Sequence, residues 1–280
     1  FLFTIIFYPV FWFNPLDLIT SIKFMSKFPQ DACTLTLGKC IKALNMDSIY
    51  IPTWFIIKLP LVIIFGIFLI PFSEKKIFKI KNNNIFFGTL ILSSIIVLLV
   101  LIFTKTPIYD EVRHLLFLTP IFYILGLSSL FFMFRKFSFF LTIFLLCFFI
   151  FENFIIFPYQ YTWFNLPTRM FNISKNFELE YFGISGREIS KKIKHHNKNN
   201  KCIVLSQSHS VKSYLNTNQY DCYIPWQLIE SKLERPFYAV PLGRNIKKSL
   251  PYNCKTIYAE KINLPFYRGN LIASKLLKCE

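Results

Sequence analysis

Four long apolar segments constrain the fold of this chain more than any other feature. They cover residues 54–72, 85–103, 114–134 and 137–157. A helix needs about 20 residues to cross a hydrocarbon core of about 30 Å, and an isolated spanning segment must satisfy its backbone hydrogen bonds internally. The sequence therefore predicts a polytopic α-helical membrane protein. The 54% hydrophobic content, against about 45–50% in soluble domains, argues against a soluble globular fold.

The first residues, FLFTIIFYPVFWF, resemble the second part of a further spanning helix. The segment is too short to cross a bilayer alone. It also lacks the initial positive charge and the small residues of a secretory signal peptide. We therefore expect a partial first span, with more of the protein preceding Phe1. Together these segments make residues 1–157 a transmembrane region.

Positive charges in two short loops predict the orientation. By the positive-inside rule, short loops rich in Lys and Arg face the cytoplasm. The basic residues of these two loops are Lys75, Lys76, Lys79 and Lys81 in one and Arg135 and Lys136 in the other. Residues 14–53 and 104–113 then form outer loops, and residues 158–280 lie outside. The tail is basic as well, but long domains cross largely regardless of charge.

The composition changes at Pro158, where apolar blocks become short and polar residues separate them. Short apolar runs bounded by polar residues are typical of strands, and periodic apolar positions between them are typical of helices. Residues 158–280 thus predict a small extracytoplasmic α/β domain. Its expected strands are 201–208, 236–242 and 254–262, and its expected helices are 182–194 and 226–233.

Six of the seven cysteines fall in segments placed outside, where disulfides are compatible with the oxidising compartment. The closest pairs in sequence are Cys33 with Cys40 and Cys202 with Cys222; free buried thiols are the alternative. Cys147 lies within the last span as a packing residue. No CxxC-type spacing is present, so we expect no metal site.

A polar cluster, Tyr109-Asp110-Glu111-Val112-Arg113-His114, precedes the third long span on its outer side. Arg113 can fork onto a phosphate, and His114 can donate to it or move a proton. Tyr and Arg also favour the membrane interface, so simple anchoring is the alternative. Asp110 and Glu111 are the competing anions for Arg113.

An aromatic run just past the last span includes Tyr159, Tyr161 and Trp163. Such rings either anchor the protein at the interface or stack on a sugar, and the sequence alone does not separate the two.

Other polar residues have weaker signals. Glu178 and Glu180 alternate along an extended stretch and would share one face. Glu152 and Asn153 are polar within a span, which favours a functional hypothesis, although they lie near its outer end. His195 and His196 sit in a Lys/Asn run and are expected to be solvated.

Four stretches, in order, resemble the C-terminal half of bacterial GT-C glycosyltransferases, specifically the dolichyl-phosphate-mannose-protein mannosyltransferase-like group (glycosyltransferase family 39) and its aminoarabinose-transferase relatives. The region that they span, from Tyr8 to Glu188, is about two thirds of the chain. They are YPVFWFNPLDLITSIKFMSKFP, IYIPTWFIIKLPLVII, YDEVRHLLFLTP and FPYQYTWFN with FELEYFGISGRE.

This resemblance implies transfer of a sugar from a polyprenyl-phosphate donor to a glycan, lipid or protein acceptor on the outer face of a bacterial inner membrane. It implies that the general base is an Asp upstream of Phe1, so no catalytic residue is assigned in this chain. Arg113 and His114 are expected to bind the donor phosphate, supported by Tyr109, Asp110 and Glu111. We expect no cofactor, no metal and no nucleic-acid partner.

Two other readings stay open. The chain could be a non-catalytic membrane protein whose outer domain binds a glycan or a partner. A transporter would want charged or broken helices near the bilayer midplane, and the predicted spans show neither.

Overall fold

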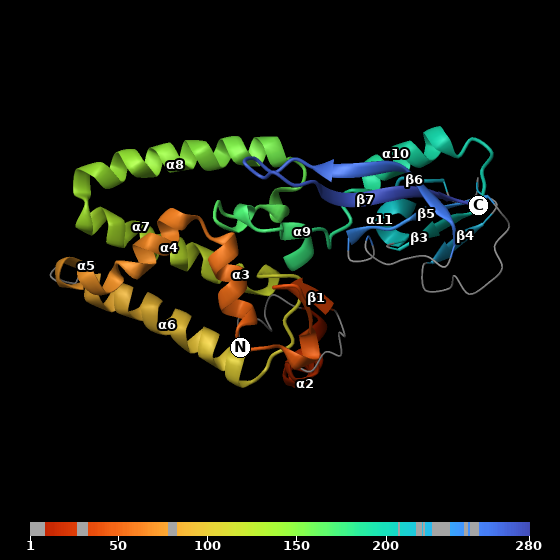
Figure 1. Cartoon of the computed structure of the whole chain (residues 1–280). Coiled ribbons are helices and arrows are strands. Elements are labelled where there is room, and N and C mark those ends of the chain that lie inside the picture. The colour runs from red at the N-terminus through yellow and green to blue at the C-terminus, as the bar shows by residue number, and fades with distance from the viewer. Residues whose placement is uncertain are drawn as a thin grey trace. The chain divides into compact units, whose positions relative to one another are not determined.

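The computed structural model describes residues 9–26, 33–77, 83–206, 208–216, 220, 222–225, 236–243, 246 and 252–280. The chain divides into two compact units (Figure 1). The first comprises Phe1–Ile56 and Ile63–Met133, and the second comprises Ile57–Val62 and Phe134–Glu280.

The described part of the first unit is helical apart from one hairpin of antiparallel strands. Its elements are η1 (Pro9–Phe11), α2 (Asp17–Ser26), β1 (Cys33–Thr36), β2 (Lys39–Lys42), η2 (Ala43–Asn45), α3 (Tyr50–Lys58), α4 (Leu61–Phe68), α5 (Ile70–Ile77), α6 (Asn83–Phe103), η3 (Arg113–Leu115) and α7 (Leu118–Met133).

The second unit joins one long helix to a sheet domain. Its elements are α8 (Arg135–Ile156), η4 (Gln160–Thr162), η5 (Thr168–Met170), α9 (Ile173–Asn176), α10 (Gly186–His196), β3 (Ile203–Leu205), α11 (Ser208–Lys212), β4 (Tyr223–Pro225), β5 (Phe237–Val240), β6 (Cys254–Ile262) and β7 (Leu271–Cys279).

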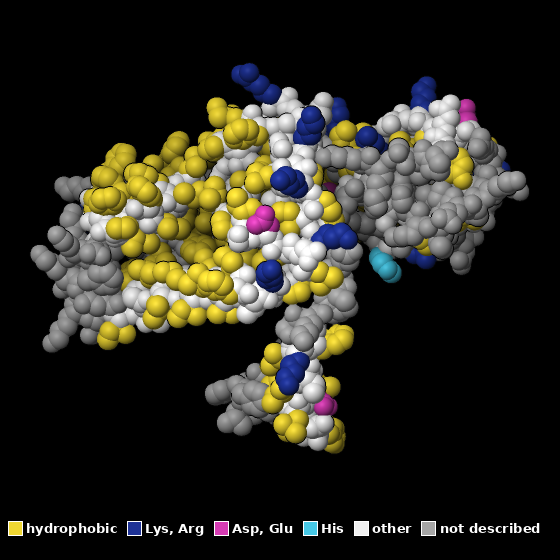
Figure 2. Space-filling model, turned by 60° about the horizontal axis from the view of Figure 1, so that its bottom comes forward, with side chains coloured by type: hydrophobic (Ala, Val, Ile, Leu, Met, Phe, Trp, Pro, Cys, Tyr) yellow, Lys and Arg dark blue, Asp and Glu magenta, His cyan; other side chains and the backbone are white. Residues whose placement is uncertain are grey.

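Two helices of the described chain are long and apolar enough to cross a membrane, at Ile85–Phe103 in α6 and Phe137–Ile156 in α8. Only 11% of either segment is buried by the protein itself. Hydrophobic side chains gather over the helices on the face that Figure 2 shows. These two helices match two of the predicted spans in length and position.

The predicted span 54–72 is not one straight helix. α3 ends at Lys58, α4 begins at Leu61, and the helix axis bends by 118° between them. Pro60 lies in the break, where it has no N–H to continue the helix and its ring clashes with the preceding turn. If the bent pair counts as one span, the described residues hold up to three.

The predicted span 114–134 is shorter in the structure, because α7 begins at Leu118 rather than His114. Pro120 lies in the first turn of α7, where its missing N–H would lack a partner anyway, whereas further inside a helix it would remove a hydrogen bond. Residues 113–115 form η3 instead. Sixteen residues rise about 24 Å, which is less than a full hydrocarbon core.

Two glycines bring α4 and α7 into close backbone contact. A Cβ on Gly66 would lie 2.1 Å from the carbonyl oxygen of Gly126, and a Cβ on Gly126 would lie 2.8 Å from that of Ile63. Small residues at such crossings let apolar helices approach each other closely.

Among the described residues, the C-terminal sheet has five strands in the order β4-β3-β5-β7-β6. β3 pairs in parallel with β4 and β5, whereas β7 pairs antiparallel with β5 and β6. Side chains alternate between its two faces, as strand geometry requires. Ile203 and Leu205 pack on one side with α10 residues Ile189 and Ile193, and Val204 packs on the other.

Three disulfides are present, so the described chain favours bridges over free thiols. Cys33–Cys40 closes the β1–β2 hairpin, Cys202–Cys222 joins the segments entering β3 and β4, and Cys254–Cys279 joins β6 to β7. Cys147 is a free, exposed thiol on α8 rather than a buried packing residue.

The three predicted strands of the tail correspond to β3, β5 and β6, and one predicted helix corresponds to α10. The sequence did not predict the β1–β2 hairpin, β4 or β7. The predicted helix 226–233 and most of the first partial span lie outside the described residues, as do Lys79 and Lys81.

Candidate functional site

The loop between α6 and α7 has an unusual backbone. Asp110 and Glu111 have φ values of 56° and 64°, so two successive residues with side chains adopt the left-handed region. Such conformations cost free energy and persist only where the surroundings hold them in place.

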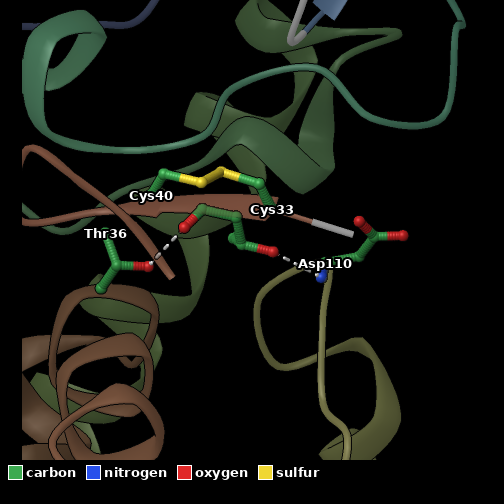
Figure 3. The surroundings of a disulfide bond; sticks show 5 residues. Cys33, Thr36, Cys40 and Asp110 are labelled. Carbon is green, nitrogen blue, oxygen red and sulfur yellow. Dashed lines mark hydrogen bonds between the residues drawn. A yellow bond between two sulfur atoms is a disulfide. The ribbon is translucent and has the colours of Figure 1, made fainter. Parts of the chain in front are cut away.

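Side chains from earlier in the first unit hold this loop. The Asp110 N–H donates to Thr34 Oγ1 at 3.1 Å, and the Glu111 N–H donates to the Tyr50 hydroxyl at 3.0 Å. Thr34 lies on β1, whose hairpin is closed by Cys33–Cys40 beside Asp110 (Figure 3). The hairpin and α3 therefore fix the backbone on which the predicted phosphate ligands stand.

The five predicted residues of this loop lie together but differ in exposure. Asp110 and Glu111 are buried, whereas Arg113 and His114 are exposed on η3. Arg113 Nη1 lies 3.3 Å from Asp110 Oδ2, and the Tyr109 and His114 rings meet edge to face at 4.7 Å. The ion pair with Asp110 is one of the two interactions expected for Arg113. Its side chain still keeps 45% of its surface exposed.

The three predicted aromatic residues occupy the interior of the second unit. Tyr159 is 4% exposed and Trp163 8% exposed. The Tyr159 hydroxyl donates to Glu260 on β6 at 3.3 Å, and the Tyr161 ring packs against Tyr181 and Phe182. The rings thus join the end of α8 to the sheet domain.

Glu180 is buried beneath these aromatics. Its Oε1 accepts the N–H groups of Gly183 and Ile184, which fixes the turn before α10. Burial raises the pKa of its carboxyl above the usual value, although the nearby Tyr161 hydroxyl and the hydrogen bond from the Gly183 N–H oppose this. Burial and the neighbouring Glu180 in turn raise the pKa of Tyr161.

Glu260 accepts a second hydrogen bond, from the Tyr258 hydroxyl. Burial and that carboxylate raise the pKa of Tyr258 to about 12, while the Lys192 ammonium lies 4.8 Å from the Tyr258 ring centre. Burial and Glu260 likewise raise the pKa of Tyr159. These phenols therefore stay protonated and act as hydrogen-bond donors.

Glu152 forms an ion pair that sequence reasoning missed. Both oxygens of Glu152 contact the Arg169 guanidinium, with Nη2 3.0 Å from Oε2, and each side chain is 1% exposed. The Trp163 Nε1–H donates to the same carboxylate at 2.8 Å. Because these partners are fully engaged with one another, the polar residue within the predicted span has a structural role here.

Two further expectations concern histidines and metals. His195 and His196 are exposed at the end of α10, which fits a solvated run. Among the residues that the structure describes, no group of three or more His, Cys, Asp or Glu side chains could hold a metal ion.

Comparison with known proteins gives no match: no family model, no curated protein and no solved structure is significantly similar to the chain.

Proposed function

We propose that this chain is the donor-binding part of a polytopic membrane glycosyltransferase that uses a polyprenyl-phosphate sugar on the outer face of the membrane. In this proposal Arg113 and His114 bind the donor phosphate. The proposal rests on the loop of residues 109–114 in the first unit. Hydrogen bonds from Asp110 and Glu111 to Thr34 and Tyr50 hold its backbone. The loop presents the exposed side chains of Arg113 and His114 directly before the apolar helix α7.

The apolar helices support the membrane part of the proposal. α6 and α8 leave most of their hydrophobic surface uncovered by protein. Soluble monomers rarely expose contiguous apolar patches of such length, whereas a bilayer would cover them.

The disulfides support an outer location for the loop and the tail. Bridges persist in oxidising compartments and are rare in the cytosol. Cys33–Cys40 lies in the segment expected outside, and Cys202–Cys222 and Cys254–Cys279 lie in the tail.

The chemistry of the loop suits a phosphate at the end of a lipid. Arg presents parallel N–H groups that match phosphate oxygens, and His adds a further N–H donor. When a sugar leaves, negative charge grows on the phosphate, and fixed cations stabilise that charge. Buried Asp110 holds Arg113 from one side, which positions the guanidinium at low entropic cost.

Binding to polyprenyl phosphate tests the proposal directly. The chain in lipid nanodiscs would be titrated with polyprenyl phosphate and, separately, with the uncharged polyprenol. Arg113→Lys should weaken phosphate binding roughly 10-fold, because an ammonium does not reproduce the guanidinium fork and a charged hydrogen bond contributes about 1.5–3 kcal/mol. Arg135→Lys, at an exposed arginine of α8, is the matched control and should bind normally.

Three outcomes decide between the donor-binding glycosyltransferase and a non-catalytic binding protein. Equal affinity for the alcohol and the phosphate would exclude phosphate recognition. Unchanged affinity in folded Arg113→Ala and His114→Ala variants would remove these residues from the site. A chain that retains glycans but no polyprenyl phosphate would instead favour the non-catalytic binding protein.

A further inference from the structure

The turn between β6 and β7 presents an aromatic side chain at its tip. The Tyr267 N–H donates to the Leu264 carbonyl at 3.2 Å, which closes the turn. Phe266 adopts a φ of 57° and is 69% exposed. A large apolar ring exposed at a hairpin tip, on a residue whose backbone is in the left-handed region, is costly in water. Contact with an apolar environment would remove the cost of exposing the ring.

This tip lies along α8, which belongs to the same compact unit (Figure 1). The Phe266 ring stacks on Phe148 of α8 with 5.9 Å between the ring centres and 27° between the planes. Beside it, the Pro265 carbonyl accepts a hydrogen bond from Arg169 Nη1 at 2.9 Å. Arg169 is itself held by Glu152 of α8, so the tip is tied to the helix at two points.

Phe148 lies well inside the candidate span Phe137–Ile156. It precedes the end of that span by eight residues (156 − 148), which is about 12 Å along the helix axis. The surface around it is apolar and open, since Phe144 and Phe151 are 67% and 57% exposed. A ring stacked on Phe148 therefore lies deeper in the predicted membrane core than the end of the span at Ile156.

The polar groups of the tip fit such a position. Non-helical backbone at membrane depth is tolerated where protein satisfies it. Pro265 has no N–H, and its carbonyl is already paired with Arg169. Tyr267 and the exposed Arg268 follow directly, and both residue types favour the membrane interface.

We propose that the β6–β7 tip inserts into the outer leaflet, with Phe266 among the acyl chains and Arg268 at the headgroups. The sheet domain thereby has a second attachment to the bilayer besides α8. This inference rests on the proposed membrane crossing of α8, and the experiment below tests the two separately.

The natural free thiol on α8 makes the test straightforward. Cys147 is exposed and adjacent to Phe148, and under non-reducing conditions the other described cysteines are bridged. An environment-sensitive fluorophore would be attached to Cys147, or, in a Cys147→Ser background, to Phe266→Cys or Arg268→Cys. Tyr214→Cys labels an exposed residue next to α11 as the aqueous control. Each labelled protein is placed in phosphatidylcholine–phosphatidylglycerol vesicles. Quenching of its fluorescence is then measured with doxyl lipids and, separately, with iodide.

Labels at 147 and 266 should be quenched by doxyl groups on the acyl chain and shielded from iodide. The label at 214 should show the reverse, and the label at 268 should respond most to a doxyl group near the headgroup.

If the label at 147 is quenched by lipid but the labels at 266 and 268 are quenched by iodide, the tip is in water and only this inference fails. If 266 is shielded from both quenchers, the ring packs against protein, which also overturns it. If 147 itself is open to iodide, α8 does not cross, and both proposals fail. Should Phe266→Cys not fold, the position of the label at 268 decides alone.

Discussion

Arg169 and Glu152 form a buried ion pair that joins the loop after α8 to the helix itself. Its two charges are desolvated together, and Trp163 Nε1, the Phe164 carbonyl and the Pro265 carbonyl complete their hydrogen bonds. A pair of this kind is costly to break, because removal of one partner leaves the other charge buried.

We therefore expect Arg169→Met to lower the free energy of unfolding by about 3–5 kcal/mol. The double variant Glu152→Leu with Arg169→Met should recover much of this loss, because no uncompensated charge remains. Lys191→Ala is the matched control: it breaks an exposed ion pair with Glu188 and should cost about 0.2–1 kcal/mol. Denaturation in detergent measures all three. Equal losses for Arg169→Met and Lys191→Ala would contradict this account.

The contact of α4 with α7 gives a second prediction. Gly66→Ala places a methyl group 2.1 Å from the Gly126 carbonyl oxygen, so the helices must separate. Overpacking of this kind costs about 1–3 kcal/mol. Gly88→Ala on α6 meets no atom within 4 Å and should be neutral or slightly stabilising, because Ala favours helix over Gly. Thermal unfolding of the two variants checks the difference, and similar melting temperatures would count against the close crossing.

How much the sequence revealed depended on the kind of signal. α6 and α8 were predictable because apolar length alone identifies a candidate span. The break at Pro60 was not, since the apolar run continues through it and Pro also occurs within membrane helices. β7 was missed because its sequence, LIASKLLKC, contains two lysines and no clean alternation, and its partners β5 and β6 supply the burial.

The candidate site divides in the same way. The Tyr109–His114 segment is contiguous, so its residues could be chosen from the sequence. The contacts of Asp110 with Thr34 and of Glu111 with Tyr50 span 76 and 61 residues, and no local pattern predicts them. Glu152 stands out as a polar residue within a predicted span, but its partner Arg169 lies in the three-residue helix η5, which is too short for a periodic sequence pattern.

Glu180 predicts a specific pH dependence. Its folded-state pKa is raised above the usual value near 4.5, chiefly by burial. The stability it contributes is therefore fully present below that usual value and is lost as the pH rises through the higher folded-state pKa.

Glu180→Gln tests this pH dependence, because it keeps an acceptor for the Gly183 N–H without the charge. Its melting temperature relative to the native chain should rise with pH in that window and then level off. Parallel curves for the two proteins would show that Glu180 is not the titrating group, and Glu188→Gln, at an exposed carboxylate, is the control.

The Cys33–Cys40 bridge should matter for the loop rather than for the sheet. It closes the hairpin that carries Thr34, which holds the Asp110 N–H. In Cys33→Ser with Cys40→Ser, the Asp110 and Glu111 amides should exchange hydrogen faster, and polyprenyl phosphate binding should weaken. Cys254→Ser with Cys279→Ser should instead lower the stability of the sheet domain and leave phosphate binding intact. Slow amide exchange in the first double variant would mean that the hairpin holds its shape without the bridge.

The proposed topology follows from the charges of the short connections and from alternation of the helices. A fusion after Asn83, at the start of α6, should place its reporter in the cytoplasm, and a fusion after Asn200, beyond α8, should place it outside. Alkaline phosphatase, active only outside, and green fluorescent protein, fluorescent only inside, should thus give opposite patterns at the two sites. Replacing Arg135 and Lys136 by glutamine should weaken the preference at the second site, because the positive charge sets the orientation. Reporters on the same side at both positions would require an even number of crossings between residues 83 and 200, so the tail and the Arg113 loop could not both lie outside as proposed.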